Sequence, residues 1–216
     1  KLESVNPGGS IKDRPVKYIL DAYEEEGLIK KGDTIIEATS GNTGISLAMM
    51  CAERGYKCII VMPSDMSEER KKMLKFFGAE LVEVDAGDFD GAIETKNTIS
   101  DEQGYVSLNQ FDNELNIECH YMTTYQEIQN HLREIDWHID AFVSGTGTGG
   151  TLMGIRRGFA EESHYYPDGT PIMPSIVAVE PAESPVMSGG EKGLHGIQGI
   201  GDGSKFLVDL DKVDEV

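Results

Sequence analysis

The chain has little positive charge, few cysteines and no long run of apolar residues. Its 19 basic residues stand against 38 acidic ones, for a formal net charge of -19. Nucleic-acid phosphates and anionic membranes bind clusters of Lys and Arg, so this charge argues against both partners. No apolar stretch approaches the ~20 residues that a membrane-spanning helix needs. We therefore expect a globular protein of the cytoplasm.

The three cysteines also exclude two kinds of site. Cys51, Cys58 and Cys119 are odd in number and lack CxxC spacing, which argues against a disulfide framework and a zinc site. We expect them to be small core residues, and we predict no metal site.

Short β-rich runs alternate with segments of helical period, which predicts an α/β fold with a mostly parallel sheet. The predicted strands are residues 33–38, 57–62, 79–84, 104–109, 140–145 and 175–180. The predicted helices are residues 44–55, 67–78, 89–104, 116–135 and 151–162. A seam near Asn116 would divide the chain into lobes at 1–116 and 117–216.

The stretch NPGGSIKDRP, residues 6–15, places one lysine behind two glycines and a serine. Such residues let the backbone bend sharply and approach a ligand closely. The pattern indicates a loop that delivers the amine of Lys12, whereas a surface lysine would be the default without other binding loops.

A second polar loop follows the predicted strand 33–38, where Thr39, Ser40, Gly41, Asn42 and Thr43 open a helix. Helix N-terminal amides joined by hydroxyls can bind a carboxylate. Simple N-capping by Ser40 or Asn42 would explain one polar residue but not the whole run.

A third loop, SGTGTGGT at 144–151, again joins a strand to a helix. Its amides and hydroxyls are suited to one phosphate. Gly145, Gly147 and Gly150 also satisfy GxGxxG, with Glu180 as a candidate ribose ligand, but Glu180 lies about ten residues beyond the usual spacing. A dinucleotide-binding domain is therefore the alternative, while the absence of GK[ST] argues against a Walker A site.

Together the three loops are suited to pyridoxal 5′-phosphate (PLP), because this aldehyde cofactor needs a lysine, a phosphate cup and donors for the substrate carboxylate. The segments NPGGSIKDR, TSGNTGISLA, MPSDMSEERKKMLKFFGAELV, GTGTGGTLMG and VEPAESPVMSGG carry a more specific signal. They resemble cysteine synthase (O-acetylserine sulfhydrylase) and cystathionine β-synthase, of the tryptophan-synthase-β-like, two-lobed PLP fold type II. The resemblance spans nearly the whole chain.

The resemblance implies a role for each matching residue. Lys12 would be the catalytic Schiff-base lysine, and Asn42 would bind the ring 3′-oxygen. The residues implied to bind the substrate are Thr39, Ser40, Gly41, Thr43, Gln110 and Gly199. The residues implied to hold the cofactor phosphate are Gly147, Thr148, Gly149, Gly150 and Thr151.

The implied activity is β-replacement, which forms L-cysteine from O-acetylserine or another activated serine and sulfide through an aminoacrylate intermediate. Use of serine and homocysteine, as in cystathionine β-synthase, stays open. Asp202 stands where the synthases have a small residue, so the nucleophile is not fixed by the sequence. The resemblance further implies a homodimer and serine acetyltransferase as a partner.

The resemblance also implies segments on both sides of the given residues, including a serine that contacts the pyridine nitrogen. We expect the chain to be truncated at both ends, and a catalytically incomplete fragment is the remaining alternative.

Overall fold

The computed structural model describes residues 1–39, 41–162, 169, 173–201 and 203–216. The chain divides into two compact units, Lys1–Asn109 and Gln110–Val216. The predicted seam at Asn116 lies within helix α5 (Glu114–Cys119) of the second unit, and a lobe boundary at that residue stays a prediction.

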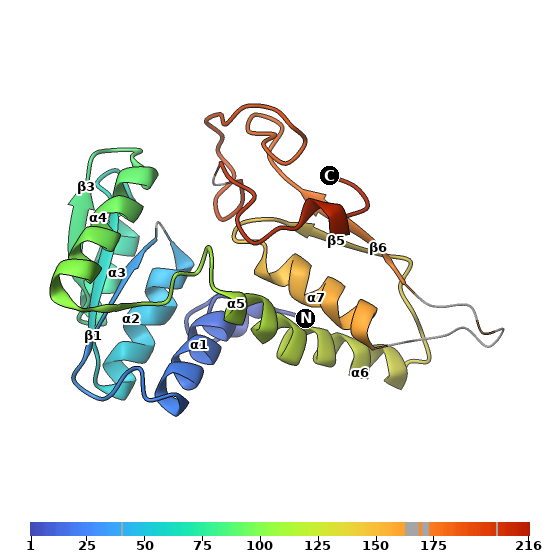
Figure 1. The fold of residues 1–216 in the computed structure, drawn as a ribbon, viewed down its shortest axis with the longest axis horizontal. Helices are drawn as coiled ribbons and strands as arrows, with labels where there is room; N and C mark the ends of the chain where they lie inside the picture. Colours follow the sequence, from blue (N-terminus) through green and yellow to red (C-terminus); the bar gives the residue numbers. More distant parts are fainter. Residues whose placement is uncertain (40, 163–168, 170–172, 202) are drawn as a thin grey trace. The chain divides into compact units, whose positions relative to one another are not determined.

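The first unit is built on a parallel sheet with the strand order β3-β2-β1-β4 (Figure 1). Its strands are β1 (Thr34–Ala38), β2 (Lys57–Pro63), β3 (Glu80–Val84) and β4 (Val106–Ser107). Its helices are α1 (Asp13–Glu25), α2 (Asn42–Arg54), α3 (Glu68–Phe76) and α4 (Phe89–Gln103), and a 3-10 turn spans Glu3–Val5.

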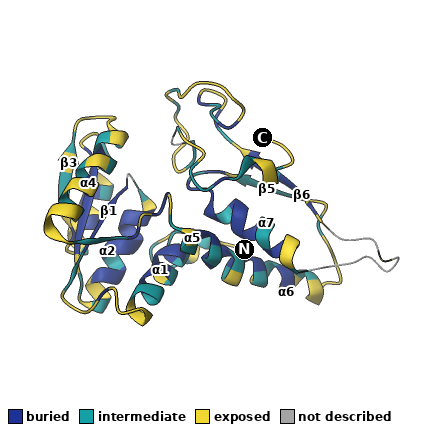
Figure 2. Cartoon of the chain, viewed as in Figure 1, coloured by how far each residue is buried: buried dark blue, intermediate teal, exposed yellow. Residues whose placement is uncertain are grey.

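The core of this unit follows the two-residue period of its strands. Ile36 and Val61 belong to one buried cluster with Ala92 of α4, whereas a Cβ added at Gly44 of α2 would contact Ile60, which points to the other face. Figure 2 shows the resulting burial of β1 and α2. Because both faces of the sheet are covered, β2 is an almost continuous apolar run, Cys58–Met62.

The second unit contains a two-stranded parallel sheet of β5 (Ala141–Gly145) and β6 (Ser175–Val179). Its helices are α5, a π-helical stretch (His120–Tyr125), α6 (Gln126–Glu134), α7 (Gly150–Glu161) and a 3-10 turn (Leu210–Lys212). Leu152 and Met153 of α7 are buried with Ile176 of β6.

Helix α7 packs closely on the preceding helical segment through glycines spaced four residues apart. A Cβ at Gly154 would lie 2.6 Å from the carbonyl oxygen of Ile117, and one at Gly158 would lie 2.3 Å from the ring of Tyr125. Both distances are shorter than a carbon atom tolerates, so the glycines set the separation of these helices.

Most predicted elements are confirmed to within two residues at each end, and the sheets are parallel as expected. Two predictions were wrong, and one helix was missed. The strand expected at 104–109 has only two residues, the helix expected at 116–135 is interrupted by the π-helical stretch, and α1 was not predicted.

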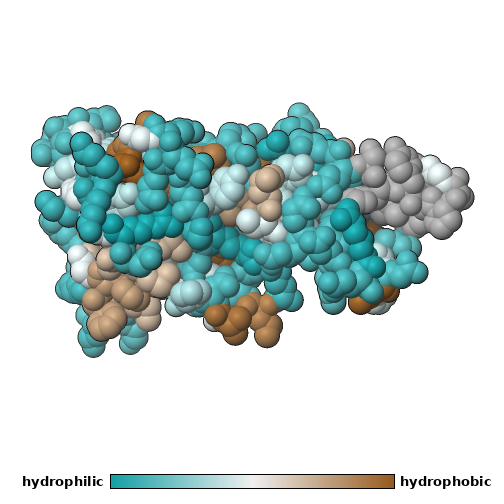
Figure 3. Space-filling model, turned by 90° about the horizontal axis from the view of Figure 1, so that it is seen from below, coloured by the Kyte–Doolittle hydropathy of each residue, from teal (hydrophilic) through white to brown (hydrophobic). Residues whose placement is uncertain are grey.

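The cysteines are buried, as expected for core residues. None of the helices in the described part of the chain has the length and apolarity needed to cross a membrane. The face drawn in Figure 3 is mainly hydrophilic, with hydrophobic areas that are separate from one another.

Candidate active site

Lys12 lies immediately before α1, at the end of the Gly-rich loop. Its backbone amide donates to the Ser10 hydroxyl at 3.2 Å, and its carbonyl accepts the amide of Val16 at 3.2 Å. Gly9 has a φ of 81°, in the left-handed region that glycine adopts most readily. The loop therefore turns sharply and places Lys12 at a helix start, in a half-buried position.

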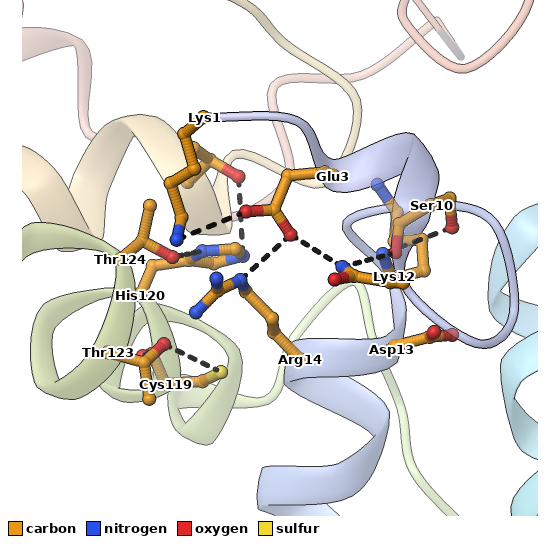
Figure 4. A network of polar contacts seen from close by, with 12 residues as sticks. Lys1, Glu3, Ser10, Lys12, Asp13, Arg14, Cys119, His120, Thr123 and Thr124 are labelled. Carbon is orange, nitrogen blue, oxygen red and sulfur yellow. Dashed lines mark hydrogen bonds and ion pairs between the residues drawn. The ribbon is translucent and has the colours of Figure 1, made fainter. Parts of the chain in front are cut away.

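A polar network holds the start of this loop (Figure 4). The Glu3 carboxylate accepts hydrogen bonds from Arg14 Nε at 2.8 Å and Asn6 Nδ2 at 2.6 Å. Asn6 Nδ2 also donates to the carbonyl of Ser10 at 3.0 Å. Arg14 follows Lys12 by two residues, so the network fixes the backbone on both sides of the lysine.

Asp13 connects the Lys12 loop to helix α2, which begins in the second polar loop. Its buried carboxylate accepts the Gly8 amide at 2.6 Å and the hydroxyl of Ser46. The first unit therefore ties these two candidate loops to each other through one side chain.

The 39–43 loop leaves the end of β1. Thr39 is buried, its amide donates to the Val61 carbonyl at 3.1 Å, and its hydroxyl accepts the Gly41 amide at 3.2 Å. Thr43 is buried and Asn42 is exposed at the first position of α2. The loop thus places an amide and hydroxyls at a helix N-terminus, an arrangement that can bind a carboxylate.

The third loop joins β5 to α7. Gly149, at the N-terminus of α7, has a φ of 90°. Among the described residues, the amides of Gly147, Thr148 and Gly149 donate no backbone hydrogen bond. Three amides without a backbone acceptor before a 12-residue helix make a candidate anion site, and this loop carries no cationic side chain.

The Gly199 loop lies against this anion site. A Cβ at Gly147 would lie 2.6 Å from the carbonyl oxygen of Gly199, so only glycine allows this approach. Gly199 itself has a φ of 89°. The structure therefore brings two of the residues predicted from separate motifs together within the second unit.

Asn116 is a site residue that the sequence analysis missed. Its buried side-chain amide donates to the Gln110 carbonyl at 2.9 Å and to the Thr148 hydroxyl at 3.0 Å. A Cβ at Gly150 would collide with Asn116 Oδ1 at 2.1 Å. Asn116 therefore holds the Gln110 segment on the Gly-rich loop, and the NxxN spacing after Asn113 was its only sequence signal.

His120 is the second missed residue. It is buried, with Nδ1 at 2.9 Å from the Thr124 hydroxyl and Nε2 at 3.2 Å from the Thr151 hydroxyl. His120 and Thr124 appear in Figure 4. The imidazole lies in the π-helical stretch, a distortion that is frequent at functional sites.

Glu180 does not have the environment of a ribose ligand. Its carboxylate accepts the amides of Met187 and Ser188, each at 2.8 Å, and the Ser188 hydroxyl at 2.6 Å. Both oxygens thus stabilise a turn of the chain itself, which argues against the dinucleotide-binding alternative.

The remaining predicted residues can be placed only in part. Ser40 and Asp202 lie outside the described residues. The predicted set is divided between the units: Lys12 and the 39–43 loop belong to the first, and Gln110, the 147–151 loop and Gly199 belong to the second.

Comparisons with known proteins agree on one family. The family model described as "Pyridoxal-phosphate dependent enzyme" matches residues 1–216. A cysteine synthase of Staphylococcus aureus (strain N315) is 47% identical over 205 residues, which cover 94% of this chain and 63% of that protein. The chain therefore spans about 63% of the length of this curated relative.

Solved structures give the same result. A hydrogen sulfide-producing enzyme from Fusobacterium nucleatum has a TM-score of 0.89 and 43% identity, over 100% of this chain and 64% of that chain. A cysteine synthase from Entamoeba histolytica has a TM-score of 0.87 and 41% identity, over 100% of this chain and 61% of that chain. The resemblance read from the sequence motifs and the expected fold class are confirmed.

Proposed function

Because the chain belongs to the family of pyridoxal-phosphate dependent enzymes, we propose that it forms L-cysteine by replacing the β-substituent of an activated serine with sulfide. The observation that carries this proposal is the run of three amides at Gly147–Gly149 without a backbone acceptor among the described residues, in a chain that also presents Lys12 on a Gly-rich loop. Its likeness to a cysteine synthase at 47% identity supports the choice of reaction.

The described residues fit the cofactor phosphate. The amides of Gly147, Thr148 and Gly149 have no backbone acceptor among the described residues, so they can donate to a group with several acceptor oxygens. The Thr148 hydroxyl accepts from Asn116, which leaves its hydrogen to donate to the phosphate.

Lys12 would hold the cofactor aldehyde through its amine and, once released by the amino acid, would remove the proton from the substrate Cα. Bound pyridoxal phosphate supplies an electron sink for the electron pair left at Cα. Acetate would then leave Cβ of O-acetylserine, and sulfide would form the new bond to that carbon.

The substrate carboxylate would bind to the 39–43 loop and Gln110, and Asn42 would bind the ring 3′-oxygen. Two hydroxyls and helix N-terminal amides would fix the carboxylate and so orient the Cα–H bond for proton removal. The lobes 1–116 and 117–216 and these residue roles are proposals that the family resemblance supports.

We also propose that the protein forms a homodimer, binds serine acetyltransferase and is located in the cytoplasm. In the absence of sulfide it would act as a lyase. Sedimentation at increasing concentration tests the dimer.

Borohydride reduction of the PLP-loaded protein, followed by peptide mapping, tests the cofactor assignment. We expect the label on Lys12, its loss in Lys12→Ala, and its retention in Lys17→Ala, a control that removes an exposed lysine of α1 paired with Asp21. A label on another lysine would refute the assignment.

The reaction is tested by measuring the cysteine that forms from O-acetylserine and sulfide. If the protein instead forms cystathionine from serine and homocysteine, the proposed reaction is contradicted.

A further inference from the structure

Strand β1 continues beyond the point where its neighbour β4 ends. The two strands pair only at Ile35 with Val106 and at Ile36 with Ser107. Near the end of β1, Glu37 is surrounded by three polar residues, and we call the four together the β1–α4 cluster: Glu37, Lys96, Ser107 and Asn109. This cluster stands where the strand ladder would continue.

The Glu37 carboxylate is bonded to the strand end itself. The side chain is 1% exposed, Oε1 accepts the Ala38 amide at 3.1 Å, and Oε2 accepts the Ser107 hydroxyl at 3.3 Å. Ala38 is the last residue of β1, and Thr39 begins the substrate loop. The carboxylate therefore fixes the backbone immediately before that loop.

Lys96 of α4 holds two other members of this cluster, Ser107 and Asn109. Its buried ammonium donates to Asn109 Oδ1 at 2.7 Å and to the Ser107 hydroxyl at 3.3 Å. The Ser107 oxygen also accepts the Asn109 amide at 3.3 Å, so its one donor and two acceptor sites are all used. The hydroxyl is thereby oriented to donate to Glu37.

We propose that Lys96 is a positioning residue for the amino-acid substrate, which holds Ser107 and Glu37 so that the Ala38 amide and the carboxylate-binding loop at 39–43 stay in place. This inference rests on the proposed function, because that function assigns the loop to the substrate. On its other side the loop is held by the bond from the Thr39 amide to Val61. Losing Lys96 would leave a buried carboxylate without a compensating cation, and the strand end would shift.

The variant Lys96→Met tests this, with L-alanine and ethylamine as probes. Both carry an amine, but only L-alanine carries a carboxylate. With PLP-loaded protein at about pH 8, we expect the Kd for L-alanine to rise about tenfold. The Kd for ethylamine and the Kd for PLP itself should stay within about twofold, because ethylamine lacks the carboxylate and no residue of the cluster is proposed to bind the cofactor.

Lys71→Met is the matched control. Lys71 is a second buried lysine of the same unit, and its ammonium contacts Glu83 at 2.8 Å and the Ser64 carbonyl at 2.7 Å. Among the described residues it makes no hydrogen bond or ion pair with the β1–α4 cluster, so this variant should lose stability without losing affinity for L-alanine.

Two further variants keep the test decisive if Lys96→Met does not fold. Ser107→Ala removes the bridging hydroxyl without burying a charge and should also weaken L-alanine binding several-fold. Combining Lys96→Met with Glu37→Gln removes both charges while an acceptor for Ala38 remains, so L-alanine affinity should recover to within about threefold of wild type.

The outcomes separate this inference from the proposed function. Wild-type affinity for L-alanine in Lys96→Met and Ser107→Ala, or an equal loss for ethylamine, would overturn the positioning role alone. A wild-type protein that binds PLP but not L-alanine would overturn the proposed substrate site, and the positioning role with it.

Discussion

Replacing Glu37 by glutamine should change how stability depends on pH. Burial raises the pKa of Glu37 to about 7, although the Lys96 ammonium and hydrogen bonds from Ala38, Ser107 and Asn109 favour the ionised form. The Cys58 thiol of β2 lies close enough to be influenced by the same carboxylate. Burial thus outweighs these partners, and the folded protein holds the Glu37 proton more tightly than the unfolded chain does.

The sign follows from this difference in proton binding. A carboxyl with a raised pKa contributes stability that is fully present below its ordinary value of 4.5 and is lost as the pH rises through about 7. At about 1.4 kcal/mol per pKa unit, the whole effect is about 3 kcal/mol, of which about 2 kcal/mol falls between about pH 5.5 and 7.5.

Urea unfolding of the PLP-free protein measures the effect at several pH values. Glutamine keeps an oxygen acceptor for Ala38 and Ser107 and does not titrate, so subtracting the two unfolding free energies isolates Glu37. We expect the wild type to lose about 2 kcal/mol relative to Glu37→Gln between about pH 5.5 and 7.5. A difference that stays constant over this range, or that changes in the opposite direction, would refute the raised pKa.

Other predictions concern the Gly-rich loop and its support. Thr148→Ala should weaken PLP binding by about 1 to 3 kcal/mol, measured by fluorescence titration, whereas Thr148→Ser should bind normally. Asn116→Ala should also weaken PLP binding, since it releases Thr148, and unchanged affinity would exclude its supporting role. Gly154→Ala should cost about 1 to 3 kcal/mol of unfolding free energy through contact with Ile117. Gly196→Ala, with open space around it, is the control and should cost almost nothing.

The strands were predictable because each carries its own signal. Runs such as 57–62 consist of β-branched and other apolar residues, and burial on both faces keeps them uninterrupted. The strand predicted at 104–109 is shorter than expected because Gly104 ends helix α4 with a φ of 68° and Asn109 has a φ of 50°, and neither conformation continues a strand. The side chain of Asn109 is held by Lys96, a contact that sequence periodicity does not reveal.

Helix α1 was missed because the loop signal extends into it. Pro15 and the residues before Lys12 indicate a turn, yet proline is tolerated in the first turn of a helix, where its missing amide costs no hydrogen bond. Beyond it, Val16, Ile19 and Leu20 are buried at helical spacing. The lysine therefore lies at a helix start, and the loop is shorter than its composition suggests.

The predicted site residues lie on loops that can be recognised from neighbouring residues in the sequence. The residues that support these loops lie elsewhere in the chain and carry no such signal. Gly147 attracts attention because glycines gather around it, whereas Asn116 and His120 belong to an ordinary helical segment of the sequence. Their contacts form only when α7 packs on that segment. Gly154 and Gly158 permit this packing because a Cβ at either position would collide with Ile117 or Tyr125, residues that lie 37 and 33 positions earlier in the chain. A glycine spacing of four in α7 is visible in the sequence, but the partner that each glycine faces is set by long-range packing. The binding loops could thus be predicted from their own residues. The hydrogen bonds from Asn116 to Thr148 and between His120 and Thr151 could be identified only from the three-dimensional structure.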